Sequence, residues 1–270
     1  MRGPDELIGV RMFGFLKQEA WFEGFSDQCV VYTRWTHDEE PSDSYPVVIL
    51  FDPKAEQRAR LRKLTTIGVI TVEFSSAAIV QDKMPAGAVV LSVKASVDAT
   101  FEARCAQANL KANLLATQTG GGARHYFVLL ESVEKLRAAL AGLELPPEAN
   151  LNVWERGDLP ALLGWLAPSR LESWALRDDA VRAALTERGD DGVPPRDTRF
   201  FFYGGDLLAL AEAASKIGFK TEAQGEPTVI SKDMPVTADE MSTLNGIFSE
   251  WVDAFGVEYD GWEAAIVAKN

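Results

Sequence analysis

Three segments of the chain share one order: an apolar run, a helix-like stretch, and a glycine between two apolar residues. The apolar runs span residues 46–51, 125–130 and 200–203, and the glycines that follow them are Gly68, Gly142 and Gly218. Glycine suits the left-handed residue that closes a helix, because it has no Cβ to clash. Repeated strand–helix–strand units predict helices packed on sheets.

The segments between these units extend the same pattern. We expect further strands at 69–74, 88–93 and 151–154, and a helix at 101–116. Residues 119–122, Thr-Gly-Gly-Gly, precede a strand rather than opening a helix, so we interpret them as a turn and not as a phosphate-binding loop. The N-terminal part is therefore predicted to be a mixed α/β region that also contains a ferredoxin-like unit.

The last quarter of the chain has the clearest helix signals. Asp206 can cap one helix, and Thr237 with Glu240 forms a capping box for the next. Apolar residues then recur at steps of three or four from Met241 to Phe255, which predicts one apolar helix face ending at Gly256. Short strands at 220–223, 228–231 and 257–263 complete the order β-α-β-β-α-β, so the predicted fold class is α+β with a C-terminal ferredoxin-like sandwich.

The domain boundary is predicted at residues 189–196, where charges, glycines and prolines interrupt the apolar pattern. This gives an N-terminal domain at 12–188 and a C-terminal domain at 197–270. Residues 1–11 precede a second natural-looking start at Met12, so we interpret them as a tag or an additional N-terminal segment.

The charge of the chain narrows the classes of partner. It has 27 basic and 40 acidic residues, a net charge of −13, and −8 of this lies within 197–270. An acidic domain repels a phosphate backbone, so no direct nucleic-acid contact is expected, and a protein with a basic surface is the better match. No apolar run approaches about 18 residues, which predicts no membrane-spanning helix. With two cysteines and no secretory signal, the expected compartment is the cytoplasm.

The C-terminal domain resembles a known family in three places. These are the aromatic strand 199–203 (Arg-Phe-Phe-Phe-Tyr), the segment 231–235 (Ser-Lys-Asp-Met-Pro) and the close 259–265 (Tyr-Asp-Gly-Trp-Glu-Ala-Ala). Together they resemble the regulator of ribonuclease activity B, a protein inhibitor of ribonuclease E. The resemblance covers about 70 residues and leaves the first 196 unassigned. It implies a ferredoxin-like fold and a role in binding a nuclease rather than in catalysis.

Strand alternation points to a candidate partner-binding patch in this domain. It places Phe201 and Tyr203 beside Trp262 on a sheet face that the domain's own helices leave open. Trp and Tyr dominate interface hot spots. The candidate partner-binding residues are Phe201, Tyr203, Tyr259, Asp260, Trp262 and Glu263. Packing of this face against the N-terminal region is the more conservative interpretation and ranks first, since exposed apolar patches of that size are rare in monomers. A bulge at Gly261 could instead turn Trp262 into the core.

Other candidate residues have structural interpretations. His125 starts a strand beside aromatic residues, and His37 stands in an acidic loop, 38–43, that we interpret as a solvated surface. Cys105 is expected to be a small buried residue of a helix. The basic helix 54–64 is interpreted as a solvated face, with docking against the acidic C-terminal domain as the alternative. We therefore predict no catalytic residues, no metal site and no cofactor.

The leading hypothesis is a non-catalytic, cytoplasmic regulatory or adaptor protein whose C-terminal domain binds a protein partner, for which the resemblance implies a ribonuclease. One alternative is an enzyme, a hydrolase or a nucleotide-handling protein, with its pocket in residues 12–188. Another is RNA binding on the open sheet face, which the acidic charge argues against. The oligomeric state is left open.

Overall fold

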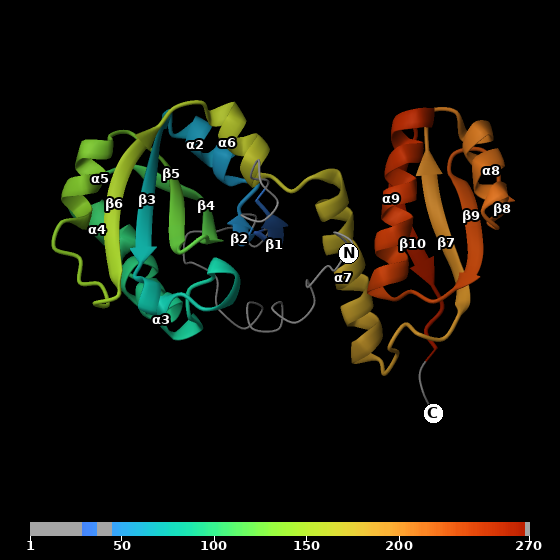
Figure 1. Cartoon of the computed structure of the whole chain (residues 1–270). Helices are drawn as coiled ribbons and strands as arrows, with labels where there is room; N and C mark the ends of the chain where they lie inside the picture. The colour runs from blue at the N-terminus through green and yellow to red at the C-terminus, as the bar shows by residue number, and fades with distance from the viewer. Residues whose placement is uncertain (1–28, 37–44, 268–270) are drawn as a thin grey trace. The chain divides into compact units, whose positions relative to one another are not determined.

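The computed structural model describes residues 29–36 and 45–267. The predicted additional segment 1–11 and the acidic loop around His37 lie outside these residues. The chain forms two compact units, the first ending at Ala167 and the second beginning at Pro168 (Figure 1). Among the described residues, no helix combines the length and the apolar character needed to cross a membrane.

The first unit is built on a six-stranded antiparallel sheet with the order β1-β2-β4-β5-β3-β6 (Figure 1). Its strands are β1 (Val30–Trp35), β2 (Pro46–Phe51), β3 (Thr66–Phe74), β4 (Ala112–Gly120), β5 (Ala123–Leu130) and β6 (Ala149–Arg156). The four strands β6-β3-β5-β4 have the order of a ferredoxin-like unit, and the hairpin of β1 and β2 extends this sheet at the β4 edge. The predicted ferredoxin-like unit in the N-terminal region is thus present.

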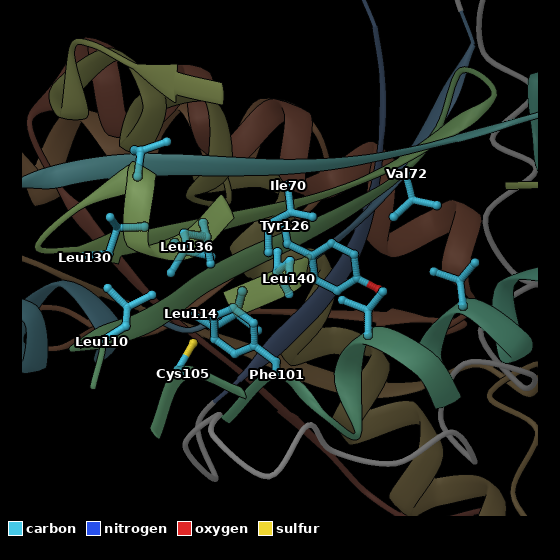
Figure 2. Packing of buried hydrophobic residues seen from close by; sticks show 14 of the residues in the cluster. Ile70, Val72, Phe101, Cys105, Leu110, Leu114, Tyr126, Leu130, Leu136 and Leu140 are labelled. Carbon is cyan, nitrogen blue, oxygen red and sulfur yellow. The ribbon is translucent and has the colours of Figure 1, made fainter. Parts of the chain in front are cut away.

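Helices lie on both faces of this sheet. They are α2 (Ala55–Leu61), α3 (Gly87–Val93), the π-helical turn η4 (Lys94–Asp98), α4 (Phe101–Gln107), α5 (Val133–Leu140) and α6 (Leu159–Leu166), with 3₁₀ turns η2 (Ser76–Ala78) and η3 (Gln81–Lys83). Figure 2 shows the core between the sheet and α3, α4 and α5, where Ile70, Tyr126 and Leu136 are fully buried. On the other face, Asn113 of β4 donates to the Ala55 carbonyl at the start of α2 over 2.9 Å.

Two predictions for this unit are wrong. Residues 88–93 form helix α3 rather than a strand, because packing of Val93 and Val97 on one helix side outweighs the β preference of a valine-rich run. The predicted helix 101–116 ends at Gln107. Asn109 then takes a left-handed conformation (φ 48°) and the chain turns into β4. Strand β4 is buried on both faces, so its sequence shows no alternation that would reveal a strand.

Two of the three predicted helix-closing glycines have that role in the structure, and the third does not. Gly142 and Gly218 have positive φ (70° and 87°) after α5 and α8, as a helix-closing glycine requires. Gly68 lies instead within strand β3, where a Cβ would come within 2.6 Å of the Leu130 side chain. It is there for close packing and not for a turn.

The second unit confirms the predicted β-α-β-β-α-β order. Its elements are α7 (Arg170–Glu187), β7 (Arg196–Tyr203), α8 (Leu207–Lys216), β8 (Lys220–Ala223), β9 (Thr228–Met234), α9 (Ala238–Phe255) and β10 (Glu258–Ala264). The antiparallel sheet has the order β10-β7-β9-β8, which is the ferredoxin-like arrangement. Asp206 caps α8 as expected, and the Thr237 side chain caps α9 by accepting the Glu240 backbone N–H, which is one of the two bonds of the predicted capping box. The two predicted caps thus fix where the two helices of the ferredoxin-like unit begin.

The core of this unit is aromatic. Phe200 and Phe202 of β7 are fully buried and pack edge-on against Phe248 of α9, with ring centroids 5.1 and 5.2 Å apart. The apolar stripe predicted for α9 is the buried face of that helix, from Met241 to Trp251. Helix α7 packs beside α9 and adds Trp174 to the same core.

The structure divides the chain elsewhere than at the predicted linker 189–196. A capping box at Ser169 starts α7, so α7 folds with the second unit and the division falls before it. Two charged residues of this predicted linker pair with each other. The side chains of Asp190 and Arg196 are buried and form an ion pair, with one N–H···O distance of 2.9 Å. The charges and glycines that predict a linker therefore form a turn that a buried ion pair holds in place.

Candidate protein-binding site

Strand β7 directs its side chains alternately to the two faces of the second sheet. Phe200 and Phe202 are buried in the core, whereas Phe201 and Tyr203 are half-buried on the opposite, open face. Arg199 lies on that open face as well. The alternation predicted for this strand is therefore present.

Strand β10 contains an extra residue that simple alternation does not anticipate. Tyr259 pairs with Phe202, but the next paired residue is Gly261, opposite Phe201. Asp260 is left out of the pairing, and Gly261 has φ 136°, as in a β-bulge. One extra residue reverses the faces of everything beyond it.

The bulge sends Trp262 to the helix side of the sheet. Trp262 lies opposite Phe200 and packs against the core, so its predicted place beside Phe201 and Tyr203 is wrong. The bulge alternative considered for Gly261 is the arrangement found. Glu263 takes the open face instead, opposite Arg199.

A buried carboxylate of α7 holds the Trp262 indole in place. The Trp262 Nε1–H donates to Asp178 Oδ1 over 2.7 Å, and Asn245 of α9 donates its amide to Asp178 Oδ2 over 2.7 Å. Asp178 is 5% exposed, and its burial raises the pKa of the carboxyl group, while the hydrogen bond from Trp262 acts in the opposite direction. Asp178 thus connects α7, α9 and β10.

An open hollow of about 270 Å³ lies between α7 and β10. Its lining residues are Trp174, Arg177, Asp178, Val181, Phe201, Tyr259, Asp260, Gly261, Trp262 and Glu263. We call this the β10 hollow. Five of the six predicted partner-binding residues line it, and Tyr203 does not. The bulge, although it separates Trp262 from the open face, brings the acidic and aromatic residues of β10 together here.

The charges of the β10 hollow are unequal. Asp178, Asp260 and Glu263 contribute carboxylates, and Arg177 contributes the single cationic side chain among the lining residues. Arg177 already donates to the backbone oxygen of Asp260 over 3.0 Å. Asp260 and Glu263 are exposed. The lining therefore offers hydrogen-bond acceptors and aromatic surface to a cationic group.

Tyr259 is the buried polar residue of this wall. It is 4% exposed, its ring packs edge-on against Trp174 with centroids 4.9 Å apart, and its hydroxyl has no partner among the described residues. Burial raises the pKa of Tyr259, and the charges that act on it include Asp178, Arg177 and Asp260. These three residues also line the hollow, so the unpaired hydroxyl stands beside its charged wall.

The open sheet face next to the hollow is acidic too. Arg199 lies near three carboxylates, those of Glu222 at 3.0 Å, Asp197 at 3.3 Å and Glu263 at 3.6 Å. One guanidinium cannot neutralise three carboxylates. Glu263 belongs to both surfaces, so the acidic character runs from the hollow onto the sheet face.

Sequence reasoning missed the contribution of α7. Trp174, Asp178 and Val181 lie on one helix face at spacings of four and three residues, and Arg177 is adjacent to that face. This spacing is the signal that could have revealed the face. It was masked because α7 also carries charged residues all around and shows little amphipathic contrast.

The remaining candidates have structural surroundings. His125 Nδ1 lies 3.0 Å from Thr71 Oγ1, and burial lowers its pKa. Gly121 and Gly122 form the turn between β4 and β5, whereas Thr119 and Gly120 of the predicted turn 119–122 are the last residues of β4. Cys105 is buried in the core, where burial raises its pKa to about 11 (Figure 2). In helix α2, Arg58 pairs with the buried carboxylate of Asp52 over 2.6 Å.

Fold and site together define a class: an α+β domain with a ferredoxin-like sheet, three helices and an acidic, aromatic hollow at its edge. In the comparison with known families, residues 177–264 match the family described as Regulator of ribonuclease activity B. The match covers about a third of the 270 residues and ends where β10 ends. No curated protein matches the chain. The N-terminal region has no assigned family.

The family match confirms the resemblance of the C-terminal segment. It covers nine of the ten residues that line the β10 hollow, all except Trp174. It supports a regulatory, protein-binding role in the control of a ribonuclease for this part of the chain.

Proposed function

We propose that the second unit is a regulatory module that binds a ribonuclease through the β10 hollow and the acidic sheet face beside it, and that it catalyses no reaction itself. The observation that carries the proposal is the convergence of five of the six candidate residues on one hollow within the family match. The net charge of −8 over residues 197–270 supports a partner with a basic surface. The proposal places this regulation in the cytoplasm.

The test uses the full-length protein and ribonuclease E from the same organism. The protein should form a complex with the nuclease and lower the rate at which it cleaves a fluorescent single-stranded RNA. The Asp260→Asn/Glu263→Gln double variant removes two exposed charges, and about tenfold weaker binding is expected from the loss of about 1.4 kcal/mol. Glu212→Gln, an exposed charge of α8 away from the hollow, is the matched control and should bind as the wild type does.

Two results would contradict the proposal. The first is a cleavage rate that stays unchanged at saturating protein. The second is equal affinity of the double variant and the Glu212→Gln control. RNA is tested separately, in a filter-binding assay with the protein alone, where weak retention at physiological salt is expected. Tight retention that weakens steeply as salt rises would favour direct RNA binding instead.

A further inference from the structure

We infer that the β10 hollow is a receptor for one arginine side chain of the protein partner. This inference rests on the proposed function, and it names the chemical group that the hollow recognises. Three features of the hollow carry it, namely the charge of its lining, an anchored indole ring and an unpaired buried hydroxyl.

Charge selects a cation. Asp178, Asp260 and Glu263 line the hollow, and Arg177 is the opposing charge, already engaged with the Asp260 backbone oxygen. Asp178 is almost fully buried, and its carboxylate accepts hydrogen bonds from two neutral donors, the Trp262 indole and the Asn245 amide. A cation that enters the hollow meets three carboxylates against one guanidinium, in surroundings less polar than water, where opposite charges attract each other more strongly.

The aromatic lining favours a flat cation. Trp262 is fixed through its indole N–H to Asp178, and Phe201 and Trp174 add ring surface to the same hollow. A guanidinium group stacks on aromatic rings and is more weakly hydrated than an ammonium group, so it loses less on leaving water. The volume of about 270 Å³ is far larger than the roughly 30 Å³ that one water molecule occupies in the liquid, which leaves room for a side chain.

The unpaired Tyr259 hydroxyl is a separate indication that a ligand donates a hydrogen bond here. Tyr259 is buried and belongs to the lining of the hollow, and its hydroxyl has no hydrogen-bond partner among the described residues. Buried polar groups in folded proteins are as a rule paired. The hydroxyl oxygen can accept an N–H, and a guanidinium carries five N–H donors in a plane, so one such group can donate to a hydroxyl and to a carboxylate at the same time. A lysine ammonium is a compact point charge without this spread.

The experiment uses full-length protein labelled with ¹⁵N at tryptophan. The Trp262 indole N–H signal, assigned with a Trp262→Phe variant, reports directly on the hollow because that N–H is bonded to Asp178. The probes are three capped peptides, Gly-Arg-Gly, Gly-Lys-Gly and Gly-citrulline-Gly, of which citrulline keeps the shape of arginine without its charge. The arginine peptide should shift this signal saturably, with at least about tenfold higher affinity than either of the others.

Tyr259→Phe separates recognition from folding. It removes the unpaired hydroxyl and keeps the ring that packs on Trp174. The variant should bind the arginine peptide about threefold or more weakly, while its melting temperature stays equal to that of the wild type or rises. A hydroxyl with a purely structural role would give unchanged peptide affinity. Glu263→Gln should lower the affinity for the arginine peptide, and Glu212→Gln should leave it unchanged.

The inference is overturned if the lysine or citrulline peptide shifts the Trp262 signal as strongly as the arginine peptide, or if none shifts it. Unchanged arginine affinity of Tyr259→Phe also overturns it. These failures differ from failure of the proposed function. If the protein inhibits ribonuclease E but does not bind the arginine peptide, only the arginine-receptor inference is refuted. A protein that binds the peptide but not the nuclease refutes the choice of partner.

Discussion

Replacing Asp178 by alanine should destabilise the second unit by about 3 kcal/mol. The carboxylate accepts two hydrogen bonds of 2.7 Å, from the Trp262 indole and the Asn245 amide. Hydrogen bonds to a charged group contribute about 1.5 to 3 kcal/mol each. Asn245 is 4% exposed, so its amide would be left without a partner, whereas half-buried Trp262 can turn to water. Relief from burying a carboxylate offsets part of the loss, which brings the net to about 3 kcal/mol.

The neighbouring residue provides the control for this prediction. Asp179 lies on the same helix and pairs with Arg182, but its side chain is 39% exposed. Exposed pairs contribute about 1 kcal/mol or less, so Asp179→Ala should have a small effect. The assay is hydrogen–deuterium exchange of the full chain, in which peptides from β7 and α9 report the opening free energy of the second unit. Equal losses for Asp178→Ala and Asp179→Ala would refute the reasoning.

The dependence on pH adds a second check. The folded chain holds the pKa of Asp178 above the ordinary value of 3.8, because burial disfavours the charged form. The folded state therefore binds the proton more tightly than the unfolded state, and this residue makes the protein more stable as pH falls through its folded pKa towards 3.8. Alanine cannot contribute this gain. The deficit of Asp178→Ala relative to the wild type should grow between neutral pH and pH 3.8, and a deficit that shrinks would contradict the assigned cause.

Two further predictions concern the second unit. Arg196 holds the pKa of Asp190 far below its usual value, so this pair stabilises the fold above the ordinary carboxyl pKa of 3.8, and the contribution is lost as pH falls below it. Asp190→Asn should lose about 3 kcal/mol of unfolding free energy near pH 7, and its stability should depend less on acid than that of the wild type. Thermal melts across pH measure both effects, and an acid profile identical to that of the wild type would count against the pair. Gly205→Ala should lower the melting temperature far more than Gly204→Ala. Both glycines have φ near 60°, but a Cβ at Gly205 would lie 2.5 Å from the Gly256 backbone, whereas a Cβ at Gly204 would meet no atom within 4 Å. Equal melting temperatures of the two variants would refute this difference in packing.

The ferredoxin-like order of the second unit could be predicted because its signals are local. Caps at Asp206 and Thr237 and the apolar stripe that ends at Gly256 depend on residues within one helix. These signals do not need tertiary contacts to operate. In the first unit, β4 and α3 escaped prediction for the opposite reason, since burial on both faces and packing of valines decide their structure.

The candidate site shows the same division. The residue types of 259–263 pointed to a binding surface, but the bulge at Asp260 sets which face each residue takes. A bulge depends on pairing with β7, and the sequence of one strand does not contain that information. The same holds for Asp178, whose partners lie on α9 and β10, 67 and 84 residues further along the chain.

Hydrogen exchange of the full-length protein, with and without ribonuclease E, tests the binding surface most directly. The account predicts slower exchange on complex formation in peptides covering 174–181 and 258–264, the two walls of the β10 hollow. Peptides from α8, which contacts α9 and does not line the hollow, should exchange at an unchanged rate. Protection confined to α8 and β8, or to the first unit, would contradict the account.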